Sequence, residues 1–547
     1  MKRLDWSKLR VWGDIARRNA AIAGDKPAFV SASGSVSFAE VNARVNRLNN
    51  ALAGLGLARG DRVAILSRNR PEFFEVYGVA KSGLVAVPLN WRLAARELLH
   101  PLGDSSPRVV VAEPDFTPVI DALRPELAGV GHFILLGEAR QGWSVYEGLL
   151  EGASADEPRV QAGPDDALCL TYSSGTTGIP KGAIITHRGA LNNCRAMVED
   201  MLKLAPDDVG LAVMPLFHVG GMWYHLFPSF ASGGTTIMLS EFDPHAVLAA
   251  IQERGVTQVH LVPTMIGALL DQPEARSMDL GRLRTLYYAA SSIPLGLLKR
   301  AMEMFRHCGF IQSFGSTEAG SVTALLPEDH VAAIRDPARE GLLLSCGRPY
   351  GGAKVEIRDF SGAPAAQGSI GDIAVRSDRI MAGYWRNPAA TAQTIVDGWL
   401  YTGDIGYLDN AGYLYIVDRK HDMIVTGGEN VYPREVEDVL YQNPNLAEVA
   451  VFAIPDPKWV ERVAAAVVLK PGRNTTAEEI RHRAAQCLAS YKCPKTVFFV
   501  DSLPKNATGK ILKKELRRQY ADLSTSAAAV EGAGRNGAGG IRGPGGS

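Results

Sequence analysis

The sequence predicts an α/β protein with a large N-terminal domain, made of two α/β sheets and a small β-rich subdomain, followed by a small mobile α+β domain. Three observations predict this fold class. Short apolar, β-prone runs alternate with helical segments up to about residue 349, short strands and turns follow it, and a compact mixed segment begins after residue 418. We therefore expect domains at 1–417 and 418–520, before a disordered Gly/Ala-rich tail at 521–547.

The N-terminal half supplies the alternation in order. Residues 7–56 open with helical patterning, and an amphipathic run that starts at Ser37 ends at Gly56. A β-branched strand at 62–66, a helix at 71–79 and a strand at 84–88 then form a β-α-β unit. Further strands are expected at 108–112, 133–136, 209–214, 234–239, 259–262 and 286–289.

The C-terminal part has a different pattern. Short strands separated by turns are expected at 354–358, 373–376 and 413–417, which suits a small β-rich subdomain. Beyond residue 418 the mixed segment predicts helices at 431–441 and 477–488, and strands at 447–454, 463–469 and 496–500.

Composition and charge exclude several classes of protein. The chain has 547 residues, of which 46% are hydrophobic, and this suffices for several cores. Lys plus Arg and Asp plus Glu both number 58, so no net field attracts nucleic acid or an anionic membrane. The six cysteines contain no C-x-x-C pair, and the chain shows neither a signal-peptide core nor an apolar run long enough to span a membrane. We expect a cytoplasmic enzyme without integral membrane contact.

A glycine- and hydroxyl-rich loop at 172–182 has the composition of a phosphate cradle. Its glycines let backbone N–H groups approach an anion, its hydroxyls add donors, and Lys181 adds positive charge. It is not a Walker loop, because Lys181 follows Pro180 and precedes Gly182. A flexible linker is the alternative, but linkers rarely lie between two apolar β-prone runs. The candidate phosphate ligands are Ser173, Ser174, Gly175, Thr176, Thr177, Gly178 and Lys181.

A second candidate site lies at 313–320, where an aromatic ring, hydroxyls and a carboxylate follow an apolar segment. Phe314 is suited to stacking on a purine, and Thr317 to donating to a phosphate. Glu318 is suited to holding Mg²⁺, which prefers carboxylate oxygens beside substrate phosphates. A turn ending in a solvated glutamate explains the same residues about equally well. The nucleotide-binding candidates here are Phe314, Gly315, Ser316 and Thr317.

Three further segments carry polar residues at strand ends or turns. Asp404 lies on a glycine turn and is suited to accepting hydrogen bonds from ribose hydroxyls, with an Asx-type turn as the alternative. Arg419 and His421 belong to a charged run at 418–422 that we interpret as both connector and site. Lys510 follows Gly509 in a lysine-rich stretch whose other lysines are expected to be a solvated face.

Together these blocks resemble the adenylate-forming superfamily, which includes acyl-CoA synthetases, peptide-synthetase adenylation domains and beetle luciferases. The resemblance runs from about residue 10 to residue 520, with 172–182 similar to the family's pyrophosphate loop and 214–221 to its gate segment. The segments 217–221, 327–330 and 427–433 resemble those of bacterial medium- and long-chain carboxylic acid–CoA ligases.

The resemblance implies an enzyme that uses ATP, Mg²⁺ and CoA. It would convert a small-molecule carboxylic acid to acyl-AMP with release of pyrophosphate and then pass the acyl group to CoA. Phe314 would stack on adenine, and Asp404 and Arg419 would hold the ribose. Thr317 would handle phosphate and Glu318 would hold Mg²⁺. Lys510 would bridge the substrate carboxylate and the α-phosphate, where a positioned cation offsets the repulsion of two anions.

The resemblance also implies an acyl pocket and a domain hinge. Gly427 and Gly428 would lie beside the pantetheine, and His421 would occupy the hinge, where relatives usually carry aspartate or lysine. The pocket would be lined by His218, Trp223, Tyr224, Ala289, Ala290 and Ser291. Bulky Trp223 and Tyr224 favour a shorter, aromatic or alicyclic acid.

Two alternatives stay open from the sequence. An acyl-AMP ligase that delivers to a separate carrier protein fits the same blocks. A catalytically inactive binder is disfavoured, because Lys510, Glu318 and Asp404 are all present. The sequence names neither the acid nor the oligomeric state, for which a homodimer is one alternative.

Overall fold

The structure is a computed structural model that describes residues 4–173, 179–291, 293–359, 361–420, 422–426, 429–457, 459–505 and 511–521. These residues form two compact units, a larger one that ends at Lys420 and a smaller one that begins at Asp422. The predicted fold class is confirmed: sheets with covering helices build the larger unit, and a small α+β unit follows.

The N-terminal segment contains a β-hairpin that the helical pattern of residues 7–56 did not predict. Helix α1 (Trp12–Ala23) is followed by strands β1 (Pro27–Ser31) and β2 (Gly34–Ser37), and then by helix α2 (Phe38–Gly54). Strand β1 pairs with β11, a strand about 200 residues later in the chain, and such a partner cannot be inferred from local pattern. Helix α2 begins where Ser37 Oγ accepts the N–H of Glu40 and the Glu40 carboxylate accepts the N–H of Ser37.

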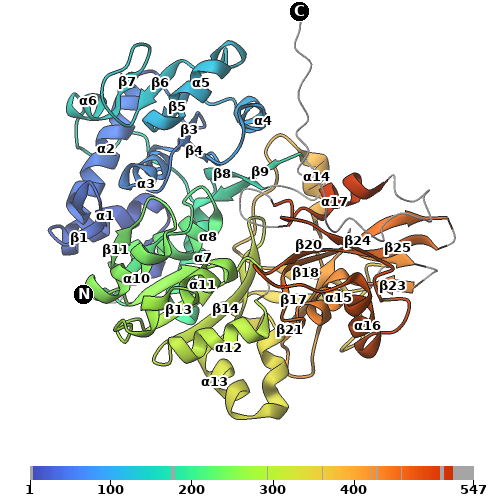
Figure 1. The fold of residues 1–547 in the computed structure, drawn as a ribbon. Coiled ribbons are helices and arrows are strands. Elements are labelled where there is room, and N and C mark those ends of the chain that lie inside the picture. Colours follow the sequence, from blue (N-terminus) through green and yellow to red (C-terminus); the bar gives the residue numbers. More distant parts are fainter. Residues whose placement is uncertain are drawn as a thin grey trace, which may run out of the picture. The chain divides into compact units, whose positions relative to one another are not determined.

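A seven-stranded sheet holds the first β-α-β units, with strands in the order β7-β6-β5-β3-β4-β8-β9 (Figure 1). All neighbours are parallel except β8 and β9, which form an antiparallel hairpin. Its strands are β3 (Arg62–Leu66), β4 (Val85–Pro88), β5 (Val109–Ala112), β6 (His132–Leu135), β7 (Ser144–Val145), β8 (Ala167–Ser173) and β9 (Lys181–Thr186), and the helices of this region are α3 (Pro71–Tyr77), α4 (Ala95–Ser105), α5 (Thr117–Leu123) and α6 (Tyr146–Glu151).

A nine-stranded sheet, in the order β16-β15-β14-β13-β12-β10-β11-β1-β2, forms the rest of the core. Its central strands are parallel, as the alternation of strands and helices predicts. The strands not yet given are β10 (Val209–Ala212), β11 (Thr235–Met238), β12 (Gln258–Leu261), β13 (Thr285–Tyr288), β14 (Gly309–Ser316), β15 (Gly320–Leu325) and β16 (Arg348–Pro349). The helices are α7 (His187–Ala196), α8 (Val219–Gly221), α9 (Phe227–Ser232), α10 (Pro244–Glu253), α11 (Pro263–Leu270), α12 (Leu295–Met304) and α13 (Pro327–Arg335).

Two segments of the larger unit are π-helical, Met197–Met201 after α7 and Met222–Leu226 between α8 and α9. Such segments are rare and are frequently found at functional sites.

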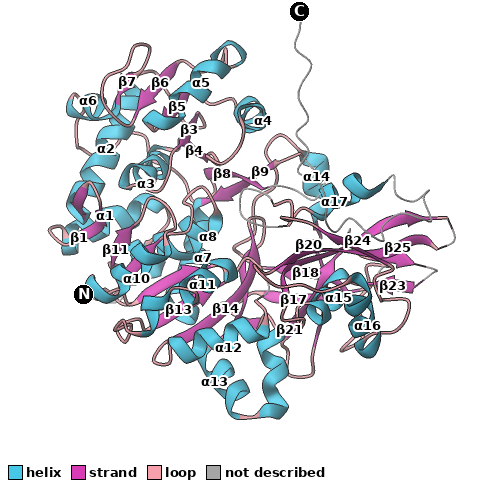
Figure 2. Cartoon of the chain, viewed as in Figure 1, coloured by secondary structure: helices cyan, strands magenta, loops and turns pink. Residues whose placement is uncertain are grey.

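The predicted β-rich subdomain is an antiparallel five-stranded sheet within the larger unit, and Figure 2 shows this part of the chain mostly as strands and loops. It consists of β17 (Lys354–Arg358), β18 (Gly371–Arg376), β19 (Ile395–Val396), β20 (Trp399–Leu408) and β21 (Leu414–Arg419), with helix α14 (Pro388–Thr394).

The smaller unit has its own five-stranded sheet and apolar core. It contains β22 (Ile424–Thr426), β23 (Glu429–Val431), β24 (Leu446–Asp456), β25 (Val460–Leu469), β26 (Thr496–Phe499), α15 (Pro433–Leu440), α16 (Ala477–Cys487) and α17 (Lys513–Tyr520). Residue 431 is therefore the end of a strand rather than the start of the predicted helix, because Pro433 opens α15. Helix α17 was not predicted.

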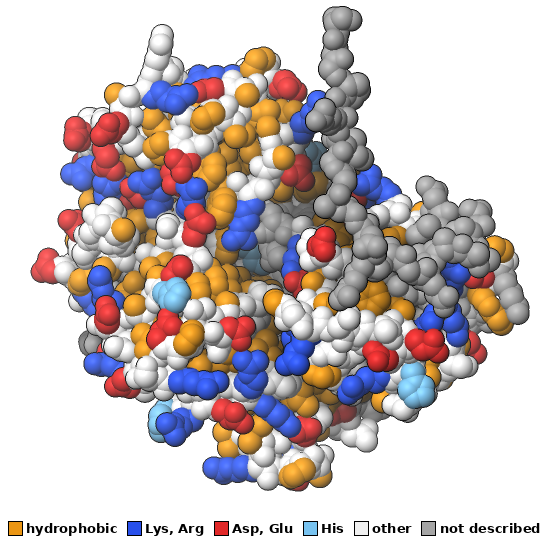
Figure 3. Space-filling view, in the orientation of Figure 1, with side chains coloured by type: hydrophobic (Ala, Val, Ile, Leu, Met, Phe, Trp, Pro, Cys, Tyr) orange, Lys and Arg blue, Asp and Glu red, His pale blue; other side chains and the backbone are white. Residues whose placement is uncertain are grey.

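The surface agrees with the balanced composition. On the face that Figure 3 shows, basic and acidic side chains are interspersed rather than separated by sign. Within the described residues, no helix is both long enough and apolar enough to cross a membrane.

Candidate active site

The predicted phosphate loop connects β8 and β9, which pair as an antiparallel hairpin. Ser173 and Lys181 are register partners at the end of that hairpin, so the strands fix both ends of the loop. The predicted ligands Ser174, Gly175, Thr176, Thr177 and Gly178 lie outside the described residues. Lys181 does lie within them, and its ammonium is 5.0 Å from the ring centroid of Tyr384, a cation–π distance.

Tyr384 connects the phosphate loop to the predicted metal ligand. Its hydroxyl donates a hydrogen bond of 3.1 Å to Glu318 Oε1. A backbone hydrogen bond holds the segment before Tyr384 beside Glu318: the N–H of Met381 donates to the carbonyl of Glu318 at 2.8 Å. Burial and then the charge of Glu318 raise the pKa of Tyr384, so the phenol keeps its proton at neutral pH. Three parts of the chain that are far apart in sequence thus meet at Lys181, Glu318 and Tyr384.

The nucleotide segment 314–318 forms the tip of the β14–β15 hairpin. Phe314 is buried, and a register shift follows it. Gly315 is packed so closely that an added Cβ would lie 2.3 Å from the carbonyl oxygen of Gly320. Ser316 Oγ accepts the N–H of Ala319 at 3.0 Å, which orders the turn that contains Thr317 and Glu318. The turn is therefore an ordered element that presents a hydroxyl and a carboxylate.

Asp404 and Arg419 face each other across strands β20 and β21. They are register partners, and Arg419 Nε lies 3.3 Å from Asp404 Oδ1. The Asp404 side chain is nearly buried whereas that of Arg419 is partly exposed. The structure thus brings together the two residues predicted to hold a ribose, as an ion pair across the two strands.

The predicted gate segment, 214–221, is held by residues that the sequence analysis did not single out. Asn69 donates to the carbonyl of Met214 at 3.0 Å and accepts the N–H of Leu216 at 2.9 Å, while the Tyr77 hydroxyl donates to the carbonyl of Leu216 at 3.2 Å. His218 Nδ1 accepts the N–H of Gly220 at 3.1 Å. Burial, and then the charge of Arg92, lower the pKa of His218 to about 4, so the gate histidine is neutral at pH 7.

The bulky residues after the gate lie in the π-helical segment. Trp223 is buried and packs edge-on against Tyr77 and Phe227, with ring centroids 5.4 and 5.2 Å apart. Tyr224 donates from its hydroxyl to the carbonyl of Ser316 at 2.8 Å, which ties this segment to the nucleotide hairpin. The remaining predicted pocket residues lie just after β13: Ala289 is buried, Ala290 has φ 73° and Ser291 is exposed.

Two buried polar side chains brace the site from outside the motifs. Asn193 donates to the carbonyl of Trp223 at 3.1 Å and accepts the N–H of Ser321 at 3.0 Å. The guanidinium of Arg379 donates to the carbonyls of Ser321, Tyr350 and Gly351 at 2.5 to 2.6 Å. Neither residue carries a local signal in the sequence, because each joins segments that lie tens to more than a hundred residues away.

Several predicted site residues cannot be placed. His421, Gly427, Gly428 and Lys510 lie outside the described residues, so their roles as hinge, CoA-side and catalytic residues stay predictions.

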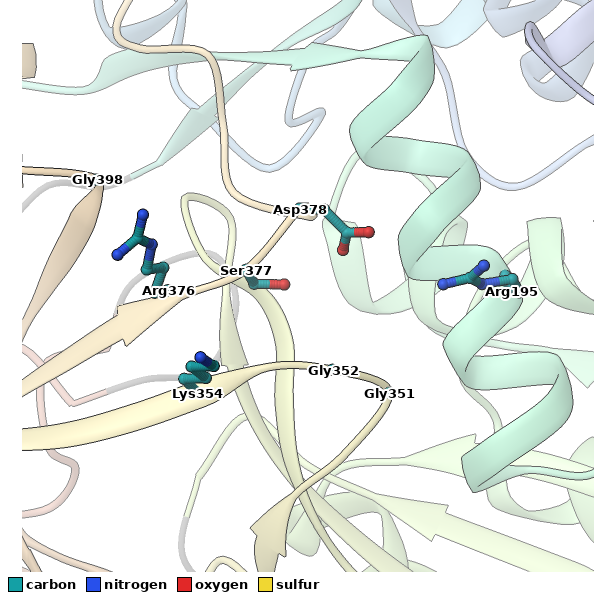
Figure 4. Close-up of a pocket in the computed structure, with 8 residues that line it drawn as sticks. All are labelled: Arg195, Gly351, Gly352, Lys354, Arg376, Ser377, Asp378 and Gly398. Atoms are coloured by element: carbon teal, nitrogen blue, oxygen red, sulfur yellow. The ribbon is translucent and has the colours of Figure 1, made fainter. Parts of the chain in front are cut away.

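One cavity of about 650 Å³ lies in the larger unit (Figure 4). Its wall is formed by Arg195 on α7, by the strand residues Lys354 and Arg376, and by turns of the subdomain. Figure 4 shows the side chains of Asp378 and Arg195 extending toward each other from opposite sides. The lining residues are Arg195, Gly351, Gly352, Lys354, Arg376, Ser377, Asp378 and Gly398. None of them is a predicted site residue.

The donor set fits a magnesium ion that is held mainly by its nucleotide. Within the described ranges, no three His, Cys, Asp or Glu side chains gather into a metal site. Mg²⁺ needs no such cage, since it is commonly bound by one or two carboxylates together with substrate phosphates. Glu318, on an ordered turn, is suited to that single contact.

Comparison with known proteins gives matches along most of the chain. A family model described as "AMP-binding enzyme" matches residues 16–385, and one described as "AMP-binding enzyme C-terminal domain" matches residues 435–510. A feruloyl-CoA synthase from Amycolatopsis is 39% identical over 89% of this chain and 94% of its own length. The fatty acid–[acyl-carrier-protein] ligase ScoC from Streptomyces coeruleorubidus is 35% identical over 90% and 93%. Among solved structures, the anthranilate CoA ligase AuaEII in complex with anthranoyl-AMP superposes with a TM-score of 0.85 at 28% identity, over 95% of this chain and 99% of that one.

Proposed function

Because the chain belongs to the AMP-binding enzyme family and is an AMP-forming acid–thiol ligase, we propose that it joins an aromatic or alicyclic carboxylic acid to CoA. In the first half-reaction a carboxylate oxygen bonds to the α-phosphorus of ATP while the bond to pyrophosphate breaks. In the second, the CoA sulfur bonds to the acyl carbon, the bond to AMP breaks, and the thiol proton leaves to solvent. The products are acyl-CoA, AMP and pyrophosphate. The proposed setting is the cytoplasm.

The observation that carries this proposal is the meeting of Lys181, Glu318 and Tyr384. It brings a cation, a carboxylate and a protonated phenol together where the predicted phosphate loop ends at Lys181. Lys181 would contact the outer phosphates, and Glu318 would hold Mg²⁺. When bound, the ion would offset charge on the phosphates. Tyr384 orients the Glu318 carboxylate through its hydrogen bond.

The other proposed contacts are with the adenine, the ribose and the α-phosphate of the nucleotide. Phe314 would border the adenine, with Gly315 and Ser316 leaving the backbone of the hairpin close to the nucleotide. Asp404 would accept hydrogen bonds from the ribose, and Arg419 fixes the orientation of that carboxylate. Lys510 would place its ammonium between the substrate carboxylate and the α-phosphate as these two anions approach.

Two observations support a ring-bearing acid over a long alkyl chain. The predicted gate is followed by the bulky residues Trp223, which packs edge-on against Tyr77, and Tyr224, whose hydroxyl donates to the carbonyl of Ser316. Two of the relatives described above are named for the aromatic acids ferulate and anthranilate.

Transfer to a separate carrier protein is the second candidate. Its support is the likeness to ScoC, whose name specifies an acyl-carrier-protein acceptor. The two candidates share the first half-reaction and differ in the thiol that receives the acyl group.

The test is AMP formation across a panel of aromatic, alicyclic and alkyl acids, each with CoA, with a phosphopantetheinylated carrier protein, and with neither. We expect turnover with CoA and ring-bearing acids. Turnover with the carrier protein alone would contradict CoA as the acceptor, and turnover limited to long alkyl acids would contradict the acid class.

The Lys510→Ala variant tests the two-step scheme. We expect its rate of acyl-AMP formation to fall about 10²–10³-fold, whereas its rate of acyl transfer from supplied acyl-AMP to CoA stays within about threefold of wild type. Lys514→Ala, at an exposed position on α17, is the matched control and should change neither rate. An equal loss in both half-reactions would contradict the role of Lys510.

A further inference from the structure

One face of the nine-stranded sheet carries two buried polar groups with unused hydrogen-bonding capacity. His260 on β12 and Tyr287 on β13 are register partners, and their rings stack with centroids 4.1 Å apart. Both side chains are 1% exposed. Among the described residues, neither His260 Nε2 nor the Tyr287 hydroxyl has a hydrogen-bond partner. Buried polar groups are almost always satisfied, so this pair requires an explanation.

The hydrogen-bonding roles of the two groups are determined by their surroundings. His260 Nδ1 lies 2.9 Å from the carbonyl oxygen of Gly220, which can only accept, so Nδ1 carries the proton and Nε2 is left as an acceptor. Burial, and then His225, lower the pKa of His260 to about 3, and burial raises the pKa of Tyr287. At neutral pH the pair therefore offers one acceptor and one hydroxyl.

Two polar side chains next to the pair on this face do find partners, whereas the hydroxyl of Thr236, further along the face on β11, has none among the described residues. Gln258, two residues before His260 on the same strand, donates to Ser229 Oγ at 2.5 Å. Ser313 on β14 shares a 2.8 Å hydrogen bond with Ser321. The packing of this face thus satisfies polar groups on either side of the pair and leaves the pair itself open.

The pair borders the predicted acyl pocket. The Gly220 carbonyl that fixes His260 belongs to the gate segment, and a Cβ added to Gly220 would lie 3.2 Å from both His218 Nδ1 and His260 Cε1. Ala289, a predicted pocket residue, lies two positions after Tyr287, the spacing that returns to the same face of a strand. His260 and Tyr287 therefore stand between the gate and the end of β13.

We propose that His260 and Tyr287 select acids whose ring carries a hydroxyl group. The substrate hydroxyl donates to His260 Nε2 and accepts from the Tyr287 hydroxyl, so that one group satisfies both protein atoms. An acid without the hydroxyl leaves both atoms unpaired in a desolvated site, and sites of this kind discriminate strongly against such analogues. This inference rests on the proposed function and names the substrate class more narrowly.

The test uses matched pairs of acids that differ only in a ring hydroxyl, such as 4-hydroxycinnamate with cinnamate and 4-hydroxybenzoate with benzoate. The measured quantity is the ratio of kcat/KM values for AMP release within each pair. We expect wild type to favour the hydroxylated acid of at least one pair by about tenfold or more. A ratio near one in every pair would overturn the inference, and it is also the result expected if an ordered water satisfies the two groups.

Two variants test whether Tyr287 and His260 cause the preference for the hydroxylated acid, and a third variant is the control. Tyr287→Phe and His260→Phe should bring the ratio to about one. Tyr288→Phe removes a hydroxyl from the neighbouring residue on the opposite face, where that hydroxyl bonds to His330 at 2.9 Å, and should leave the ratio unchanged. Unchanged ratios in both pocket variants, or equal changes in all three variants, would overturn the assignment.

A stability measurement separates this inference from the proposed function. Because the Tyr287 hydroxyl is unpartnered without substrate, Tyr287→Phe should leave the melting temperature of the free enzyme equal or higher, whereas Tyr288→Phe should lower it. A lower melting temperature in Tyr287→Phe would show that its hydroxyl is already satisfied. If no acid of the panel releases AMP, the proposed function fails, whereas AMP release without hydroxyl preference contradicts only this inference.

Discussion

Acidification should destabilise the larger unit through His187, the first residue of α7. This side chain is fully buried, and its Nδ1 accepts the backbone N–H of Trp12 at 3.0 Å. A ring nitrogen that accepts a hydrogen bond carries no proton. Protonation of Nδ1 would turn it into a donor that faces the N–H donor of Trp12. Burial lowers the pKa of His187 from 6.5 to about 4, so the folded protein holds this ring neutral where the unfolded chain does not.

The magnitude follows from the difference between the two pKa values. Between pH 6.5 and pH 4 the unfolded chain binds a proton that the folded chain excludes, so the stabilisation is complete above pH 6.5 and is lost as the pH falls toward 4. Each pH unit within this window changes the free energy of unfolding by about 1.4 kcal/mol. Lowering the pH from 6.5 to 5 should therefore cost about 2 kcal/mol at this residue alone.

Urea unfolding at pH 7.5 and pH 5.0, followed by tryptophan fluorescence, measures this effect. The variant His187→Gln keeps a neutral acceptor for the Trp12 N–H but does not titrate. We expect the variant to lose about 2 kcal/mol less than wild type between the two pH values. His307→Gln, at an exposed position of the same unit, is the control and should behave as wild type. An equal loss in His187→Gln and wild type would refute the reasoning.

Three further predictions concern the site and its supports. Arg379→Lys should lower the free energy of unfolding by about 3 kcal/mol in urea, because one ammonium cannot reach the three carbonyls that the guanidinium binds; a loss below about 1 kcal/mol would contradict this role. Ala290→Gly should stabilise the protein by about 1 kcal/mol, because φ 73° is costly for alanine, and an unchanged melting temperature would argue against strain. Asp404→Asn should raise the KM for ATP about tenfold, the equivalent of one weakened hydrogen bond, with the KM of the acid unchanged. Parallel changes in both KM values would remove Asp404 from the ribose site.

Local pattern predicted many of the strands but the bounds of only a few helices. The β-branched run at 62–66 is strand β3, and the amphipathic run after Ser37 is helix α2 with its capping box. These elements are visible because the hydrophobic period and the capping residues are properties of neighbouring residues. Strands β24 and β25 extend beyond the predicted 447–454 and 463–469. Their pairing runs from Leu446–Leu469 to Asp456–Val460, with one register shift between Leu446 and Glu448, and it stabilises residues that lack a strong local preference.

Contacts between distant segments could not be predicted from the motifs. Glu318 and Tyr384 are 66 positions apart, and only the sheet topology brings the phenol to the carboxylate. The same holds for Asn193 and Trp223, whose hydrogen bond joins α7 to the π-helical segment. The motifs identified residues suited to phosphate, ribose and metal contacts, whereas the residues that orient them are recognisable only in the fold.

Deleting one residue from the π-helical segment Met222–Leu226 is a simple change that we expect to alter which acids the enzyme accepts. A π-helical turn holds an extra residue compared with an α-helical one, and each residue of an α-helix advances the side chain by about 100°. An in-frame deletion of the His225 codon would let the segment return to α-helical geometry and rotate Trp223 and Tyr224 by about that angle relative to α9. Profiling that deletion variant on the acid panel would show whether its preferences shift. A deletion of three nucleotides would then exchange the residues predicted to line the acyl pocket, while the sheet and the predicted nucleotide-binding residues stay unchanged.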